Sequence, residues 1–139
     1  MSTEIFSHLN WLAVAVAGLA YFLLGAIWYS FLFRNAWIRF TGVKVDDPDA
    51  KKGVAGIMGA SLVLMILCSL GLAILTYKTG VTTWMGGVKL GLVTGICFSV
   101  TGISISYLYE KRPMGLHFIN GGYNVVGSVL ASIILSVWQ

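Results

Sequence analysis

Residues 10–33 read NWLAVAVAGLAYFLLGAIWYSFLF, a stretch of 24 residues without a charged side chain. A helix of about 20 apolar residues crosses the hydrocarbon core of a bilayer, so this stretch predicts a membrane span over about residues 9–33. The stretch is too long for the apolar core of a signal peptide, and no basic segment precedes it. We therefore expect an uncleaved membrane-spanning helix.

Three further apolar segments follow, at about residues 54–77, 83–109 and 116–138. The composition agrees with a membrane protein, because 58% of the 139 residues are hydrophobic and only 10% are charged, whereas a soluble domain carries about 25% charged residues. The last two connections are only a few residues long, so their spans should be antiparallel neighbours. The sequence predicts one all-α domain over residues 1–139, an integral membrane four-helix transmembrane bundle with short loops.

The first loop, residues 34–53, carries the pattern of a membrane interface. Its first half alternates arginines with aromatic residues, which places rings at headgroup depth and guanidinium groups in water or against phosphate. Gly42 is predicted to end a short helix. Asp47 and Pro48 are predicted to begin the next helix. Capping explains the three aspartates of this loop better than metal binding, because the glycine and glutamate of a calcium-binding loop are missing.

Basic residues gather in alternate loops. Seven of the nine lie in the first and third loops, and the other two are Lys78 and Lys89. Because Lys and Arg are enriched in cytoplasmic loops, loops one and three are predicted to be cytoplasmic and both termini to lie outside. The net charge of +4 follows from these loops, and we expect no nucleic-acid partner. The seven residues are Arg34, Arg39, Lys44, Lys51, Lys52, Lys111 and Arg112.

The fourth span begins with polar side chains where apolar ones are expected. His117, Asn120 and Asn124, followed by Gly127 and Ala131, are spaced by three or four residues and share one helix face. An amide that faces lipid costs a few kcal/mol, so this face should meet protein or a wet cavity. Two interpretations stay open: hydrogen bonds between helices, which we favour, and a polar pocket open to the cytoplasm. The residues of this polar seam are His117, Asn120, Tyr123, Asn124, Tyr21, Trp28 and Tyr29.

Small residues mark expected helix contacts. Gly87, Gly91 and Gly95 are spaced by four, and with Gly102 they form a ridge that lets another backbone approach closely. The neighbour is a helix of the same chain or of a second protomer, and we favour the same chain because a small bundle first needs its own contacts. The complete set of predicted packing residues is Gly18, Gly25, Gly87, Gly91, Gly95, Gly102, Gly127 and Ala131.

The predicted spans lack the residues that ion-coupled transport, catalysis and metal binding usually require. No predicted span contains Asp or Glu, the residues that carry ions in coupled transporters. No pair of nucleophile and base is apparent, so we predict neither an enzyme nor a cofactor. Cys68 and Cys97 form no CxxC motif and no Cys/His cluster, so we expect them to pack in the core rather than bind a metal.

Both ends of the sequence resemble domain-of-unknown-function family 1761. The first-span stretch at 10–33, with AW at 36–37, is similar to the first helix of that family. RPMGLHFINGGYNVVGSVLASIILSVW at 112–138 is similar to its last helix. The resemblance implies a small bacterial inner-membrane protein with four helices, and it implies no activity. The matching positions are Asn10, Trp11, Gly25, Trp28, Tyr29, Trp37, Pro113, Asn120 and Tyr123.

Three hypotheses about function follow. The leading one is a non-enzymatic membrane protein, either a structural or partner subunit or a homo-oligomer, whose partners are membrane lipids and membrane protein. The alternative is a binder or facilitator of a small polar solute or lipid headgroup, which requires that spans one and four touch at the polar seam. A lipid-modifying enzyme comes third, because no catalytic group can be named for it.

Overall fold

The computed structural model describes residues 3–43 and 53–139. This part of the chain is helical, without a strand. Four of its helical stretches are long and apolar enough to cross a membrane: Trp11–Leu32, Val54–Thr79, Trp84–Tyr109 and Met114–Val137. The predicted all-α fold with four membrane-length helices is confirmed.

The first span is a helix with a π-helical end. A short helix, α1 (Ile5–His8), precedes α2 (Trp11–Ile27) and the π-helix η1 (Trp28–Leu32). Asn10 caps α2, because its side-chain oxygen accepts a hydrogen bond of 3.1 Å from the amide of Ala13. In η1, the amide of Phe33 reaches back five residues to the carbonyl of Trp28, at 2.9 Å.

A short helix, α3 (Arg34–Thr41), follows this span and ends where the sequence predicted. Gly42 lies just after its last turn with φ of 71°, a left-handed conformation that glycine adopts at no steric cost. The cap predicted at Asp47 and Pro48 lies outside the described residues.

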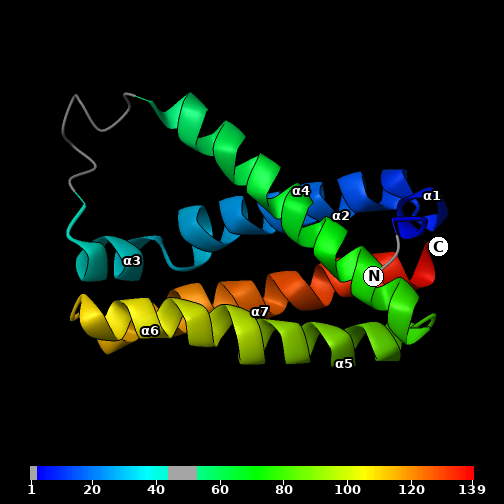
Figure 1. The fold of residues 1–139 in the computed structure, drawn as a ribbon. Helices are drawn as coiled ribbons and strands as arrows, with labels where there is room; N and C mark the ends of the chain where they lie inside the picture. The colour runs from blue at the N-terminus through cyan, green and yellow to red at the C-terminus, as the bar shows by residue number, and fades with distance from the viewer. Residues whose placement is uncertain (1–2, 44–52) are drawn as a thin grey trace.

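The second span is α4 (Val54–Thr79), and the fourth is α7 (Met114–Val137). The third span consists of three consecutive helical elements, α5 (Trp84–Thr94), η3 (Gly95–Val100) and α6 (Thr101–Tyr109). In Figure 1, α7 runs alongside the α5–α6 helix, and α4 crosses α2 obliquely. Both marked termini and the α4–α5 turn lie at one end of the bundle, and α3 and the α6–α7 turn lie at the other.

The last span, α7, is the central helix of the bundle. It contacts α2, α4, α5 and η3, and also α3 and α6. Much of the core lies between α7, α2 and the second half of α4. The buried residues of this core are Ala13, Val14, Ala17, Tyr21, Leu72, Ala73, Tyr123, Ala131 and Leu135.

Three of the predicted glycines bring α5 against the backbone of α7. A Cβ atom added to Gly87 would lie 2.8 Å from the carbonyl oxygen of Ser132, and one added to Gly91 would lie 2.8 Å from that of Ser128. At Gly95 the added atom would lie 2.8 Å from the Cα of Val125. The ridge therefore packs within the chain, because only glycine leaves room for this approach.

Gly102 does not belong to this ridge. It is exposed, and nothing lies within 4 Å of a Cβ added there. In an uninterrupted α-helix, Gly95 and Gly102 would share a face. The π-helix η3 lies between them and adds residues to the turn, which rotates Gly102 away from α7.

The two cysteines depart from the prediction of core packing. Cys68 on α4 and Cys97 on η3 are both exposed. In a membrane protein an apolar side chain gains no hydrophobic free energy by leaving lipid for the protein interior. The apolar character of cysteine therefore does not fix which side of a span it faces.

The close approach of α5 and α7 can be tested by substitution of a ridge glycine. Gly91→Leu should destabilise the bundle by about 1–3 kcal/mol or more, because its side chain would force the two backbones apart. Thermal unfolding of the detergent-solubilised protein measures this effect. Gly102→Leu is the control and should change the midpoint little, since its position is open. Equal midpoints for the two variants would contradict the assignment of the ridge to α7.

Candidate functional site

Spans one and four meet along the polar seam. The hydroxyl of Tyr29 donates to the side-chain oxygen of Asn120 at 2.5 Å, and that of Tyr21 donates to the side-chain oxygen of Asn124 at 2.9 Å. The indole nitrogen of Trp28 also bonds across the helices, to a backbone carbonyl of α7 at 3.0 Å. The structure therefore brings the aromatic residues of span one onto the amides of span four.

The amide nitrogens of the seam are also used. Nδ2 of Asn120 donates to the hydroxyl of Tyr107 on α6 at 2.6 Å. Nδ2 of Asn124 donates to the backbone carbonyl of Asn120 at 2.8 Å. Each amide thus accepts one hydrogen bond and donates another inside the bundle. This arrangement removes the cost of placing an amide in lipid.

Tyr123 fills the space between the other rings of the seam. Its hydroxyl donates to the backbone carbonyl of Tyr21 at 3.0 Å. Its ring meets those of Tyr21 and Tyr29 edge to face, with centroids 5.3 and 5.4 Å apart. Two predicted glycines make room here, since a Cβ on Gly25 would lie 2.9 Å from the Tyr123 hydroxyl and one on Gly127 would lie 2.6 Å from Cζ of Tyr21.

The other predicted packing residues also face neighbouring helices. Gly18 lies against α4, because a Cβ added there would be 2.8 Å from the Cα of Ile66. Ala131 on α7 is completely buried in the core. The small residues of spans one and four therefore serve contacts within this chain.

His117 faces α6 rather than span one. Its Nδ1 atom lies 3.2 Å from the hydroxyl oxygen of Ser104, and its ring meets that of Tyr107 edge to face at 5.3 Å. The sequence analysis missed Ser104 and Tyr107. Both lie on α6, which a short turn joins to α7, so this short connection was the available signal that α6 supplies partners to the start of α7.

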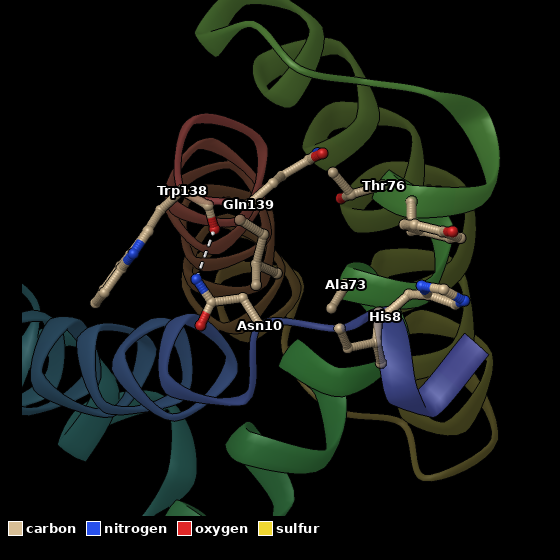
Figure 2. Close-up of a pocket in the computed structure, with 9 residues that line it drawn as sticks. His8, Asn10, Ala73, Thr76, Trp138 and Gln139 are labelled. Carbon is tan, nitrogen blue, oxygen red and sulfur yellow. Dashed lines mark hydrogen bonds between the residues drawn. The ribbon is translucent and has the colours of Figure 1, made fainter. Parts of the chain in front are cut away.

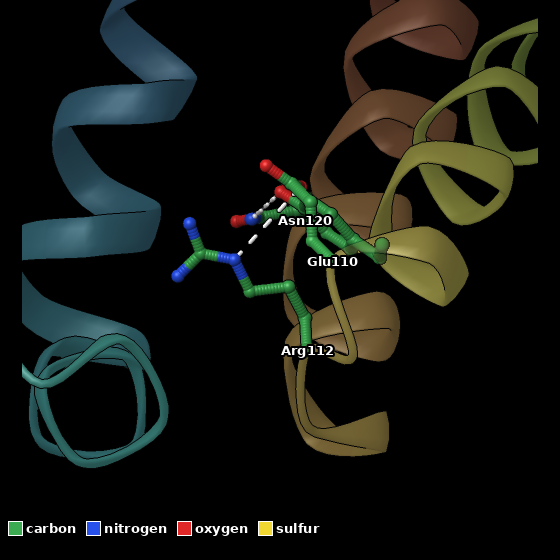
Figure 3. A network of polar contacts seen from close by, with 4 residues as sticks. Glu110, Arg112 and Asn120 are labelled. Atoms are coloured by element: carbon green, nitrogen blue, oxygen red, sulfur yellow. Dashed lines mark hydrogen bonds and ion pairs between the residues drawn. The ribbon is translucent and has the colours of Figure 1, made fainter.

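An ion pair lies close to the seam at the α6–α7 turn. Figure 3 shows Arg112 extending from this turn toward α2 and α3, with Asn120 and Glu110 nearby. Nε of Arg112 lies 3.9 Å from a carboxylate oxygen of Glu110, and both side chains are about half exposed, at 44% and 52%. An exposed pair at this distance contributes little to stability.

A groove lies beside the seam, between α2, α4 and α7. It has a volume of about 240 Å³. Tyr21, Asn124, Met65 and Cys68 are among the residues that line it. The Tyr123 hydroxyl contacts the sulfur of Met65 at 3.5 Å. Because the tyrosine and asparagine groups already bond to one another, a ligand in this groove would compete with bonds that hold the bundle.

A second, smaller pocket lies at the end of the bundle that carries both termini (Figure 2). Its volume is about 170 Å³. Asn10 donates from Nδ2 to the carbonyl of Trp138 at 3.4 Å, and His8 stacks on Tyr77 with ring centroids 5.7 Å apart. Within residues 3–43 and 53–139, no group of three or more His, Cys, Asp and Glu side chains is placed to hold a metal ion.

The fold and the seam define a class of small proteins with four membrane-length helices joined by polar contacts inside the bundle. A family model described as a protein of unknown function, DUF1761, matches residues 12–136. The chain belongs to this family. Comparison with curated proteins and with solved structures finds no match.

We expect the hydrogen bonds of the seam to contribute to the free energy of unfolding. Tyr21→Phe should cost about 0.6 kcal/mol or somewhat more, because it removes one hydrogen bond between helices and leaves the oxygen of Asn124 without that donor. Thermal unfolding in detergent measures the change. Tyr109→Phe is the control, since Tyr109 is 87% exposed. A loss of the same size in both variants would refute the structural role of the Tyr21 hydroxyl.

Proposed function

We propose that the protein is a non-enzymatic, multi-pass protein of the bacterial inner membrane that acts by assembling with another transmembrane helix. That helix belongs to a second copy of the chain or to a different membrane protein. The contact surface is the first part of α4, residues 54–60. This surface differs from the glycine ridge of α5, which the chain covers itself.

One observation carries the proposal. All residues from 53 to 60 are exposed, and nothing lies within 4 Å of a Cβ added to Gly56 or Gly59. In Figure 1 the first half of α4 leans away from α2, while its second half crosses the bundle. Helix contacts in membranes are enriched in small residues that let backbones approach. The small residues of this segment are left without such a neighbour.

The small residues of this surface favour a transmembrane helix as the binding partner. Gly59 and Ala60 follow Gly56 by three and four residues. All three therefore lie on one face of α4. At Gly18, Gly87 and Gly91 the same kind of small-residue surface receives a backbone of this chain. A second helix can approach the start of α4 in the same way.

The groove beside Tyr21 and Asn124 favours a second candidate function. Its polar atoms could meet a small polar solute or a lipid headgroup, with the protein as binder or facilitator. The assembly function is better supported, because both seam amides are already hydrogen-bonded inside the bundle. Asn124→Leu distinguishes the two, because Asn124 lines the groove. Loss of binding or flux with an intact assembly favours the second function, and general destabilisation favours the first.

Photo-cross-linking in the native membrane tests the assembly function. A photoreactive amino acid in place of Gly59 should produce an adduct heavier than the monomer, whose mass distinguishes a second copy from another protein. The same residue in place of Gly71 is the control, since Gly71 is also exposed on α4 with no neighbour within 4 Å. No adduct at position 59, or equal adducts at both positions, would rule out this surface.

We also propose that loops one and three are cytoplasmic and both termini lie outside. Arg34, Arg39, Lys111 and Arg112 support this orientation, because Lys and Arg favour the cytoplasmic side and these four residues lie in the α3 region and the α6–α7 turn. Lys78 lies in the last turn of α4, and the α4–α5 turn is at the opposite end of the bundle (Figure 1).

Labelling of single cysteines tests the orientation. In a background with Cys68→Ala and Cys97→Ala, a membrane-impermeant thiol reagent added to intact cells should label Lys78→Cys. It should label Lys111→Cys only after the membrane is permeabilised. The reverse pattern would show that the orientation is inverted.

A further inference from the structure

The junction of η1 and α3 forms a concave elbow at the end of the first span. The chain leaves its membrane-length helix at Leu32 and begins α3 at Arg34. An open hollow of about 700 Å³ lies in this elbow. Six residues that line it are Ser30, Phe31, Leu32, Arg34, Asn35 and Arg39.

The lining of the elbow combines cationic and apolar side chains. Arg34 and Arg39 supply two exposed guanidinium groups, and Asn35 adds an amide. Phe31 and Leu32 are 82% and 61% exposed in the last turn of the span, where the side chains of a membrane helix meet lipid. A ligand that suits both kinds of side chain carries an anionic group joined to an apolar body.

Arg34 and Arg39 are both exposed on α3. No carboxylate in the described part of the chain lies within ion-pair distance of Arg34 or Arg39, whereas Arg112 has Glu110 beside it. The Arg39 guanidinium lies 4.9 Å from the centre of the Phe40 ring. A guanidinium group presents paired N–H donors that match a phosphate oxygen pair.

Aromatic contacts hold the elbow in place. The Trp37 ring meets that of Tyr29 edge to face at 5.9 Å, and the rings of Trp28 and Phe33 lie 4.7 Å apart. Phe40 packs directly over Gly115 at the start of α7. The two arginines therefore sit on a helix whose position is fixed before a ligand binds, which lowers the entropic cost of binding.

We propose that this elbow binds the phosphate headgroup of an anionic phospholipid, with its acyl chains along Phe31 and Leu32. The position at the end of a span is the depth at which headgroup phosphates lie, and basic pockets at such positions bind anionic headgroups. The site is separate from the start of α4 and from the polar seam. It gives the protein a lipid preference in addition to its assembly function.

Titration of the purified protein with phosphatidylglycerol, read by native mass spectrometry, tests the proposal. The wild type should retain one phosphatidylglycerol molecule in preference to phosphatidylcholine. The double variant Arg34→Gln/Arg39→Gln should bind it roughly 25-fold more weakly, and each single variant about fivefold more weakly. Both side chains are exposed, so the variants should unfold at the wild-type temperature.

The matched control is Lys111→Gln/Arg112→Gln, which removes the same charge at the same end of the bundle and should leave the affinity within about twofold of the wild type. An equal loss in the two double variants would overturn the proposal, because binding would then depend on general surface charge. Unchanged binding by Arg34→Gln/Arg39→Gln would also overturn it. Displacement of the lipid by an equal concentration of inorganic phosphate would show that the elbow binds the free ion instead of a lipid.

Discussion

Asparagine amides inside a membrane span need hydrogen-bond partners, and this requirement organises the bundle. Neither lipid tails nor water at this depth can bond to Asn120 and Asn124, so aromatic hydroxyls from α2, η1 and α6 do so. These bonds fix how α7 is rotated and how far it is shifted along its neighbours. The rotation that satisfies the amides also directs the glycines and serines of α7 toward Tyr21 and α5.

The two sides of α7 are held by different interactions. Directional hydrogen bonds and edge-to-face rings join it to the first span. On the other side, Gly87, Gly91 and Gly95 bring the backbone of α5 into van der Waals contact with it. Because hydrophobic burial does not drive helix association in lipid, these two kinds of contact supply the stability. Among the surfaces that these contacts leave open are the start of α4 and the elbow at α3.

The spans could be predicted from the sequence by the length of their apolar segments, and the glycine ridge by its spacing of four residues. The polar residues of α7 could be predicted to have partners, because an amide that faces lipid costs free energy. It did not predict the rotation of residues after a π-helix, as Gly102 shows, since no residue pattern announced η3. Cys68 and Cys97 were placed wrongly because apolar residues face lipid and protein alike. Tyr107 was missed because the sequence alone does not distinguish a tyrosine that anchors the end of a span at the membrane interface from one that bonds to an amide inside the bundle.

We propose that the polar seam serves the bundle and is not a solute site. Native mass spectrometry of the protein released gently from its own membrane tests it most directly. We expect an assembly that carries phospholipid and no discrete polar solute, and Asn120→Leu should weaken the fold without removing a ligand. A single small polar molecule retained by the wild type and lost in Asn120→Leu would contradict the claim and identify the seam as a binding site.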